Sequence, residues 1–125
     1  MIKLIVLKDE FKIYKLDLKQ VIPDSVFKNE FISITKTKDE ISIVTTCKLD
    51  LNYDDLSEDW KGFKVDGILD FSLIGIINDL TKPMKDNNIS VFVISTYNTD
   101  YLFVKEESFE KAIEIFRKLD YVELK

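Results

Sequence analysis

The alternation of apolar and polar residues changes along the chain, and its second half gives the clearer pattern. The run "WKGFKVDG" (60–67) alternates as a strand that ends at Gly67, while "ISVFVIST" (89–96), "DYLFVK" (100–105) and "DYVELK" (120–125) predict three more strands. Because "ISVFVIST" is apolar on both faces, we expect it at the centre of a sheet.

Two segments between these strands change to a helical period. The run "ILDFSLIGIINDLTKPMKD" (68–86) predicts a helix with Asp70 or Ser72 as its N-cap. Because Pro83 removes a helical hydrogen bond, the pattern does not fix the residue at which this helix ends. Its apolar face carries Leu73, Ile76, Ile77, Leu80 and Met84. The run "EESFEKAIEIFRKL" (106–119) predicts a second amphipathic helix. The order βαββαβ predicts a four-stranded antiparallel sheet with both helices on one face.

The first half is a weaker copy of this pattern. "KLIVLKDEFKIYKL" (3–16) predicts two strands around Asp9 and Glu10, and "FISITKTKDEISIV" (31–44) predicts a hairpin. "VIPDSVFKN" (21–29) has room only for a short helical turn. The acidic stretch 50–59 connects the halves, so we place the boundary near Glu58. The expected fold is α+β, with a helix-poor module at 1–58 and a complete module at 59–125.

Composition and charge narrow the class of protein. Of 125 residues, 46% are apolar, including nine Phe, which is ample for a folded core. The net charge of −5 is spread over both halves and neither half is basic, so we expect no nucleic-acid partner. No apolar run approaches the roughly 20 residues that cross a bilayer, and charge interrupts the first residues too early for a signal peptide. We therefore expect a cytoplasmic protein without a membrane partner.

The residue types leave little scope for catalysis or metal binding. The chain has no histidine and one cysteine, Cys47, which we expect to be a buried or half-buried small residue, with no disulfide and no zinc site. The run "DLNYDD" (50–55) is similar to the start of a calcium loop, but the turn glycine is missing and Lys61 takes the twelfth position. We therefore expect no metal and no cofactor. Without a phosphate loop or a nucleophile motif, an enzyme is not expected either.

A polar run, "STYNTD" (95–100), separates two apolar strands. It is typical of a hairpin turn, because Asn and Asp bond their own backbone and tolerate turn conformations. Alternatively, the turn is half of a binding site. Tyr97, Tyr101 and Phe103 could also stack on bases, but the acidic charge and the single arginine, Arg117, disfavour nucleic acid.

The runs "DGILDFSLIG" (66–75) and "ISTYNTDYLFV" (94–104) together resemble the tandem ACT-domain proteins, a group that includes small bacterial proteins and the arginine sensor of animal growth signalling. The upstream "EFISITKTKDEISIV" (30–44) resembles the first module of such proteins. This resemblance implies two ferredoxin-like βαββαβ ACT modules that bind a small molecule, most often an amino acid, at an interface between modules. It also implies a regulatory function.

The resemblance assigns ligand contacts to two loops. In the first, Asp70 matches the family's aspartate, whereas the Pro-Gly pair that commonly follows it is absent, and Gly75 restores space one step into the helix. In the second, Asp100 matches the aspartate that holds a ligand's ammonium group, with Thr96 and Tyr97 just before it. The implied ligand residues are Asp70, Ser72, Leu73, Ile74, Gly75, Thr96, Tyr97 and Asp100.

Two classes of function fit these observations. One is a sensor of a small, amino acid-like ligand, and the other is an interaction module whose ACT-like sheets only dimerise. In both cases we expect a homodimer, since exposed sheet edges pair readily and ACT sites are built at interfaces.

Overall fold

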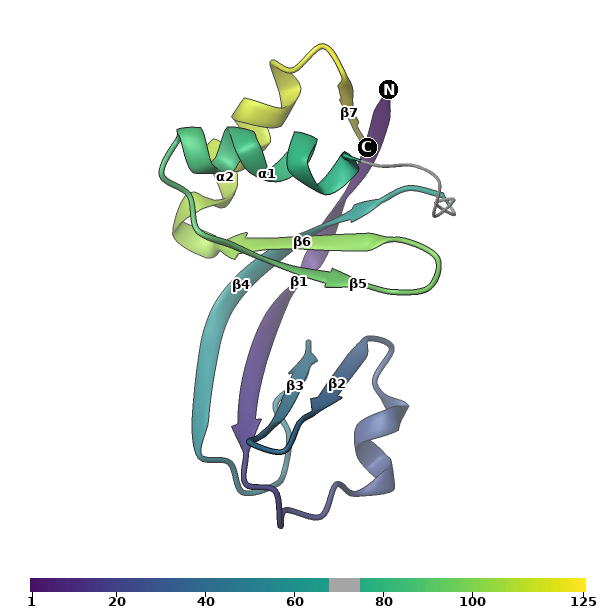
Figure 1. The fold of residues 1–125 in the computed structure, drawn as a ribbon, viewed down its shortest axis with the longest axis vertical. Coiled ribbons are helices and arrows are strands. Elements are labelled where there is room, and N and C mark those ends of the chain that lie inside the picture. The colour runs from purple at the N-terminus through teal and green to yellow at the C-terminus, as the bar shows by residue number, and fades with distance from the viewer. Residues whose placement is uncertain (68–74) are drawn as a thin grey trace. The chain divides into compact units, whose positions relative to one another are not determined.

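The computed structural model describes residues 1–67 and 75–125, which form two compact units (Figure 1). We call Met1–Lys8 with Trp60–Lys125 the helical unit, and Asp9–Asp59 the strand unit. The elements in chain order are β1 (Ile2–Leu16), η1 (Asp24–Lys28), β2 (Ile32–Lys36), β3 (Ile41–Thr45), β4 (Asp55–Val65), α1 (Ile76–Asp86), β5 (Val91–Ser95), β6 (Asp100–Lys105), α2 (Glu106–Arg117) and β7 (Val122–Leu124).

The helical unit contains the predicted βαββαβ order, from β4 to β7, but in its described residues the sheet has five strands instead of four. Their order is β7, β1, β4, β6 and β5, because the first residues of β1 lie between β7 and β4. On one side β1 pairs in parallel with β7, where Ile2 lies opposite Val122. On the other side the Asp66 N–H donates to the Lys3 carbonyl at 2.8 Å. The strand that completes this sheet therefore comes from the other end of the sequence.

The expectation that "ISVFVIST" is central was wrong, because β5 is an edge strand that pairs only with β6 within the described residues. Its apolar character on both faces has a different cause. Val91 and Val93 pack against the helical core, whereas Phe92 stacks on Phe103 of β6 with 4.5 Å between ring centroids. Trp60 also contacts Phe92, edge to face, at 4.6 Å. The two apolar faces of β5 are therefore explained by the helical core on one side and by aromatic packing on the other, and not by a central position in the sheet.

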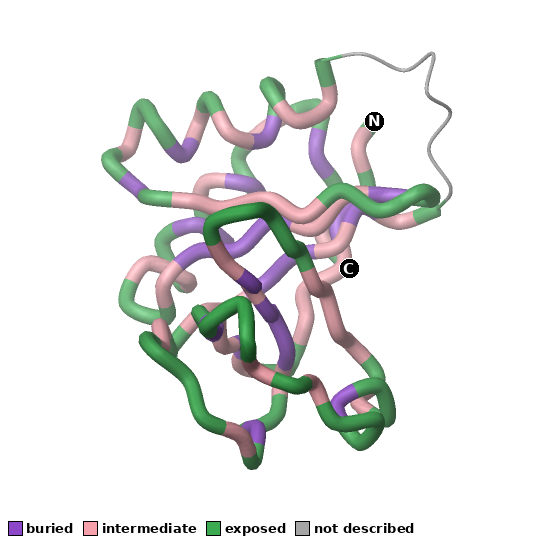
Figure 2. The backbone as a smooth tube through the Cα atoms, turned by 60° about the horizontal axis from the view of Figure 1, so that its bottom comes forward, coloured by how far each residue is buried: buried purple, intermediate pink, exposed green. Residues whose placement is uncertain are grey.

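Both helices of this unit cover the same face of its sheet (Figure 1). Leu80 and Met84 of α1 and Phe116 of α2 have no exposed surface. They pack on alternate strand residues, including Phe63 and Val104. Because each helix packs on the sheet with one face, buried and exposed positions alternate along the helices (Figure 2). The predicted two-layer arrangement is confirmed for this unit.

Helix α1 begins later than its periodicity suggested. It starts at Ile76, and its N-cap is Gly75, whose φ of 85° is in the left-handed region that glycine adopts without strain. The expected N-caps, Asp70 and Ser72, are therefore wrong for this helix and lie outside the described residues. Pro83 is inside the helix, and α2 matches its predicted span.

The strand unit is a sheet of four strands in the order β2, β3, β1 and β4. The predicted hairpin is present as β2 and β3, and the predicted helical turn is η1. Two expectations were wrong. The stretch 3–16 forms one strand, β1, instead of two strands around Asp9 and Glu10, and Cys47 is exposed instead of buried or half-buried. Tyr14 is fully buried in the small core of this unit, and its hydroxyl oxygen accepts a hydrogen bond from the Leu49 N–H at 2.9 Å.

Candidate functional site

The polar run that followed β5 forms a tight, internally bonded turn. Ser95, the last residue of β5, lies opposite Asp100, the first residue of β6. The Thr96 N–H donates to the Thr99 carbonyl at 2.8 Å, and the Thr99 N–H donates to the Thr96 hydroxyl oxygen at 3.2 Å. The prediction of a hairpin turn is therefore confirmed, and these hydrogen bonds close the turn between Thr96 and Thr99.

Asp100 follows this turn as the first residue of β6, and the residue is half-buried. The Ser95 hydroxyl donates to its Oδ1 at 2.5 Å, a charge-assisted bond that orients the side chain. Within residues 1–67 and 75–125, no lysine or arginine forms an ion pair with it. The Ser95 hydroxyl thus orients the carboxylate, and no ion pair with a lysine or arginine of the described residues compensates its negative charge.

Thr99 was not among the predicted site residues, yet it fixes the place of the turn. Its side chain is only 5% exposed, and its hydroxyl donates to the Val65 carbonyl at the end of β4 at 2.7 Å. The segment that follows β4 therefore starts beside the β5–β6 turn. No sequence signal pointed to this bond, because donor and acceptor are 34 residues apart.

The end of β4 is also tied to the C-terminal strand. The carboxylate of Asp66 forms an ion pair with the Lys125 ammonium. The hydrogen bond from Lys125 lowers the pKa of Asp66, and the same bond raises the pKa of Lys125. Since the Asp66 carboxylate already has a cationic partner, Asp100 is the better candidate for binding a cation at this end of the sheet.

The structure describes half of the eight predicted ligand residues. Thr96, Tyr97 and Asp100 lie together on the turn, and Tyr97 is 82% exposed there. Gly75 caps α1 and has open space where a side chain would be. The remaining four lie outside the described residues: Asp70, Ser72, Leu73 and Ile74.

A family model for the ACT domain matches residues 55–118, which is more than half of the chain. The chain belongs to the ACT-domain family. A second family model, described as an N-terminal domain, matches residues 9–51, inside the strand unit of this ACT-domain protein. The comparison with curated proteins found no match.

Solved structures resemble the ACT-domain protein over almost its whole length. A structural-genomics protein of Agobacterium tumefaciens is 31% identical, with a TM-score of 0.82 over 99% of this chain and 93% of that chain. A protein of Vibrio cholerae, described as a possible transport protein, is 14% identical, with a TM-score of 0.67 over 91% of this chain and 86% of that one. The ligand-free regulatory subunit of aspartate kinase from Thermus thermophilus is 13% identical, with a TM-score of 0.60 over 88% and 92% of the two chains. The last two show a shared fold.

No helix in the described part of the chain is long and apolar enough to cross a membrane.

Proposed function

We propose that this ACT-domain protein is a cytoplasmic regulatory module that binds a small, amino acid-like ligand at an interface between ACT modules. The family match supports this function, because the ACT domains that the sequence resembles commonly bind small molecules and thereby regulate an enzyme. The observation that carries the proposal is the Asp100 carboxylate, which Ser95 orients and which no lysine or arginine of the described residues neutralises.

An α-amino acid offers two charges that suit this part of the fold. Its ammonium group would pair with Asp100, next to Thr96 and Tyr97, in a charge-assisted hydrogen bond. Its carboxylate would accept hydrogen bonds from backbone N–H groups of Ser72–Gly75, in the loop that begins with Asp70. The bond between Thr99 and Val65 supports this pairing, because it brings the start of that connection beside the turn.

The same family resemblance leads us to propose a tandem arrangement. In it, residues 1–58 and 59–125 are two ACT modules of the arginine-sensor type, and residues 1–8 of the first module add a strand to the sheet of the second. The match of a separate N-terminal family to residues 9–51 supports a division of the chain into two modules.

A thermal-shift screen of the wild-type protein against the twenty common amino acids tests the proposal. A ligand present at about 100 times its dissociation constant should stabilise the protein by roughly 2.7 kcal/mol. For the amino acid that stabilises most, calorimetry should show that Asp100→Asn weakens binding roughly 10- to 100-fold, because the variant keeps the shape of the side chain and loses its charge.

Asp39→Asn is the matched control. Asp39 lies in the turn of the β2–β3 hairpin, where its N–H bonds the Thr37 hydroxyl oxygen at 3.1 Å, so the substitution removes the same charge from a comparable turn. Equal affinity of the wild type and Asp100→Asn would reduce Asp100 to an ordinary turn residue. If no amino acid stabilises the wild type, the alternative of an unliganded dimerisation module is favoured instead.

A further inference from the structure

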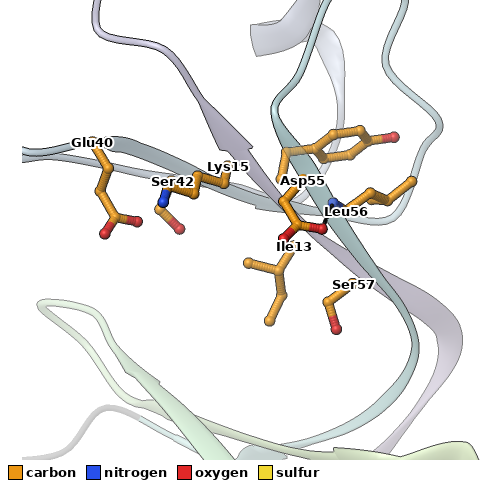
Figure 3. Close-up of a pocket in the computed structure, with 8 residues that line it drawn as sticks. Ile13, Lys15, Glu40, Ser42, Asp55, Leu56 and Ser57 are labelled. Carbon is orange, nitrogen blue, oxygen red and sulfur yellow. Dashed lines mark hydrogen bonds between the residues drawn. The ribbon is translucent and has the colours of Figure 1, made fainter.

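The strand unit contains a depression of about 210 Å³ that is lined by residues of its own strands (Figure 3). Three strands contribute to it: β1 with Ile13 and Lys15, β3 with Ser42, and β4 with Asp55. Lys15 and Ser42 are direct neighbours in the β1–β3 register. The alternation of side chains along β1 places Ile13 and Lys15 on the face opposite the core residues Tyr14 and Leu16.

The lining of this depression combines charges of both signs that do not pair with each other. Neither the Lys15 ammonium nor the carboxylates of Glu40 and Asp55 form an ion pair within the described residues. Figure 3 shows the Lys15 side chain extending toward Ser42 and Glu40, whereas the carboxylate of Asp55 lies next to Ile13, on the side away from Glu40.

Asp55 is held in place by its own backbone. Its Oδ1 accepts a hydrogen bond from the Leu56 N–H at 2.9 Å, which leaves its second carboxylate oxygen for another donor. Lys15, by contrast, is a long and flexible cation next to the hydroxyl of Ser42. A carboxylate that enters at Lys15 therefore finds an ammonium and a hydroxyl donor together, while an ammonium finds the Asp55 carboxylate beside the apolar side chain of Ile13.

We propose that the strand unit binds a second small zwitterion in this depression, with the ligand's carboxylate on Lys15 and Ser42 and its ammonium on Asp55. The volume is below the 300 Å³ or so at which pockets for drug-sized molecules begin, and it suits a molecule of amino acid size. This site uses residues of the strand unit alone, so it does not depend on the site proposed at Asp100.

The test is a ¹H–¹⁵N NMR titration of the full-length protein with each of the twenty common amino acids. At least one should cause saturable shifts of the backbone amides of Lys15, Ser42 and Asp55. Acetate and ethylammonium, which carry one charge each, should bind at least tenfold more weakly than that amino acid, since each can use only one end of the depression.

Two substitutions locate the binding groups. Lys15→Gln and Asp55→Asn should each weaken the affinity in the strand unit roughly tenfold or more, whereas Lys36→Gln, which removes an exposed lysine at the end of β2, should leave it unchanged. A spectrum with wild-type dispersion shows that each variant is folded. Unchanged affinity in folded Lys15→Gln or Asp55→Asn overturns the proposal, as does the absence of saturable shifts in the strand unit with every amino acid.

The same spectra separate this site from the one at Asp100. Shifts in the strand unit that persist in Asp100→Asn support the second site even if the turn binds nothing. Shifts confined to residues 95–101 support the function proposed for the turn and overturn the second site.

Discussion

At the scale of single residues, the hydroxyl of Thr99 is the group on which the placement of the candidate turn depends most. Thr99→Val keeps the shape of the side chain but leaves the Val65 carbonyl without its donor in a buried position. We expect the free energy of unfolding to fall by about 1–3 kcal/mol, measured by urea denaturation. Thr96→Val is the control. Among the described residues the hydroxyl of the exposed Thr96 bonds to Thr99 within the same turn, so its loss should cost less. Equal losses would contradict the assigned role of Thr99.

The ion pair between Asp66 and Lys125 makes stability depend on pH in a defined direction. The pKa of Asp66 is lowered below its usual 3.8 in the folded protein, because Lys125 donates a hydrogen bond to the charged form. The stabilisation is therefore complete above the pKa of the unfolded state and is lost as the pH falls through the lower folded pKa.

Urea denaturation of the wild type and Asp66→Asn at a series of pH values measures this effect. The wild type should be the more stable of the two near pH 7, and the difference should disappear in acid below the folded pKa of Asp66. Lys125→Gln should reproduce the loss at neutral pH. A difference between the wild type and Asp66→Asn that persists unchanged in strong acid would exclude the ion pair as its source.

The sequence indicated part of the candidate site and could not have indicated the rest. The polar run 95–100 predicted a turn from local chemistry alone, and the structure has that turn. The hydrogen bond that positions the turn joins residues far apart in the sequence, so local chemistry does not predict it. Thr99 reaches Val65 only because β4 and β6 pair in the register that places Lys64 opposite Tyr101, and a register between distant strands is set by the packed sheet.

At the scale of elements, helix α1 contains a proline whose missing hydrogen bond is replaced from outside the helix. Pro83 has no N–H for the carbonyl of Asp79, four residues before it, and the Tyr121 hydroxyl donates to that carbonyl at 3.0 Å. Tyr121 lies just before β7, so the bond also links α1 to the strand that follows α2.

A double-mutant cycle tests this compensation. Tyr121→Phe should lower the free energy of unfolding by about 0.5–1.5 kcal/mol. In the Pro83→Ala background the same substitution should cost less, because position 83 then supplies the N–H that the Asp79 carbonyl lacks. Additive effects, measured by urea denaturation, would show that Tyr121 does not compensate for Pro83.

The sequence predicted the bounds of some elements correctly but the position of one strand in the sheet wrongly. Helix α2 followed from the helical period of its apolar residues, and strand β6 followed from a short apolar run that comes directly after turn residues. Strand β5 was expected at the sheet centre and lies at an edge, because apolar residues on both faces also arise when one face packs on helices and the other on aromatic side chains. Pattern alone does not separate these two environments.

At the scale of the whole molecule, we predict self-association. The edge strand β5 contains no charged residue and no proline, the two features that commonly prevent edge strands from pairing. Sedimentation velocity should therefore show a homodimer at high micromolar concentration, and Ile94→Lys, which adds a charge to β5, should shift the protein toward monomer. Val21→Lys, at an exposed site in the strand unit, should leave the dimer intact. A wild type that stays monomeric at several hundred micromolar would contradict the prediction.

The sequence by itself determined the kinds and order of the elements, because hydrophobic period, turn residues and the βαββαβ succession are local properties of the chain. Only the tertiary structure decided which strands meet. The start of β1 enters the helical unit between β7 and β4, where Leu4 is fully buried, although nothing near Leu4 in the sequence distinguishes it from an ordinary first strand. The physical reason is that a strand contributes to whichever core buries its apolar face, and that choice depends on surfaces formed by residues more than fifty positions away.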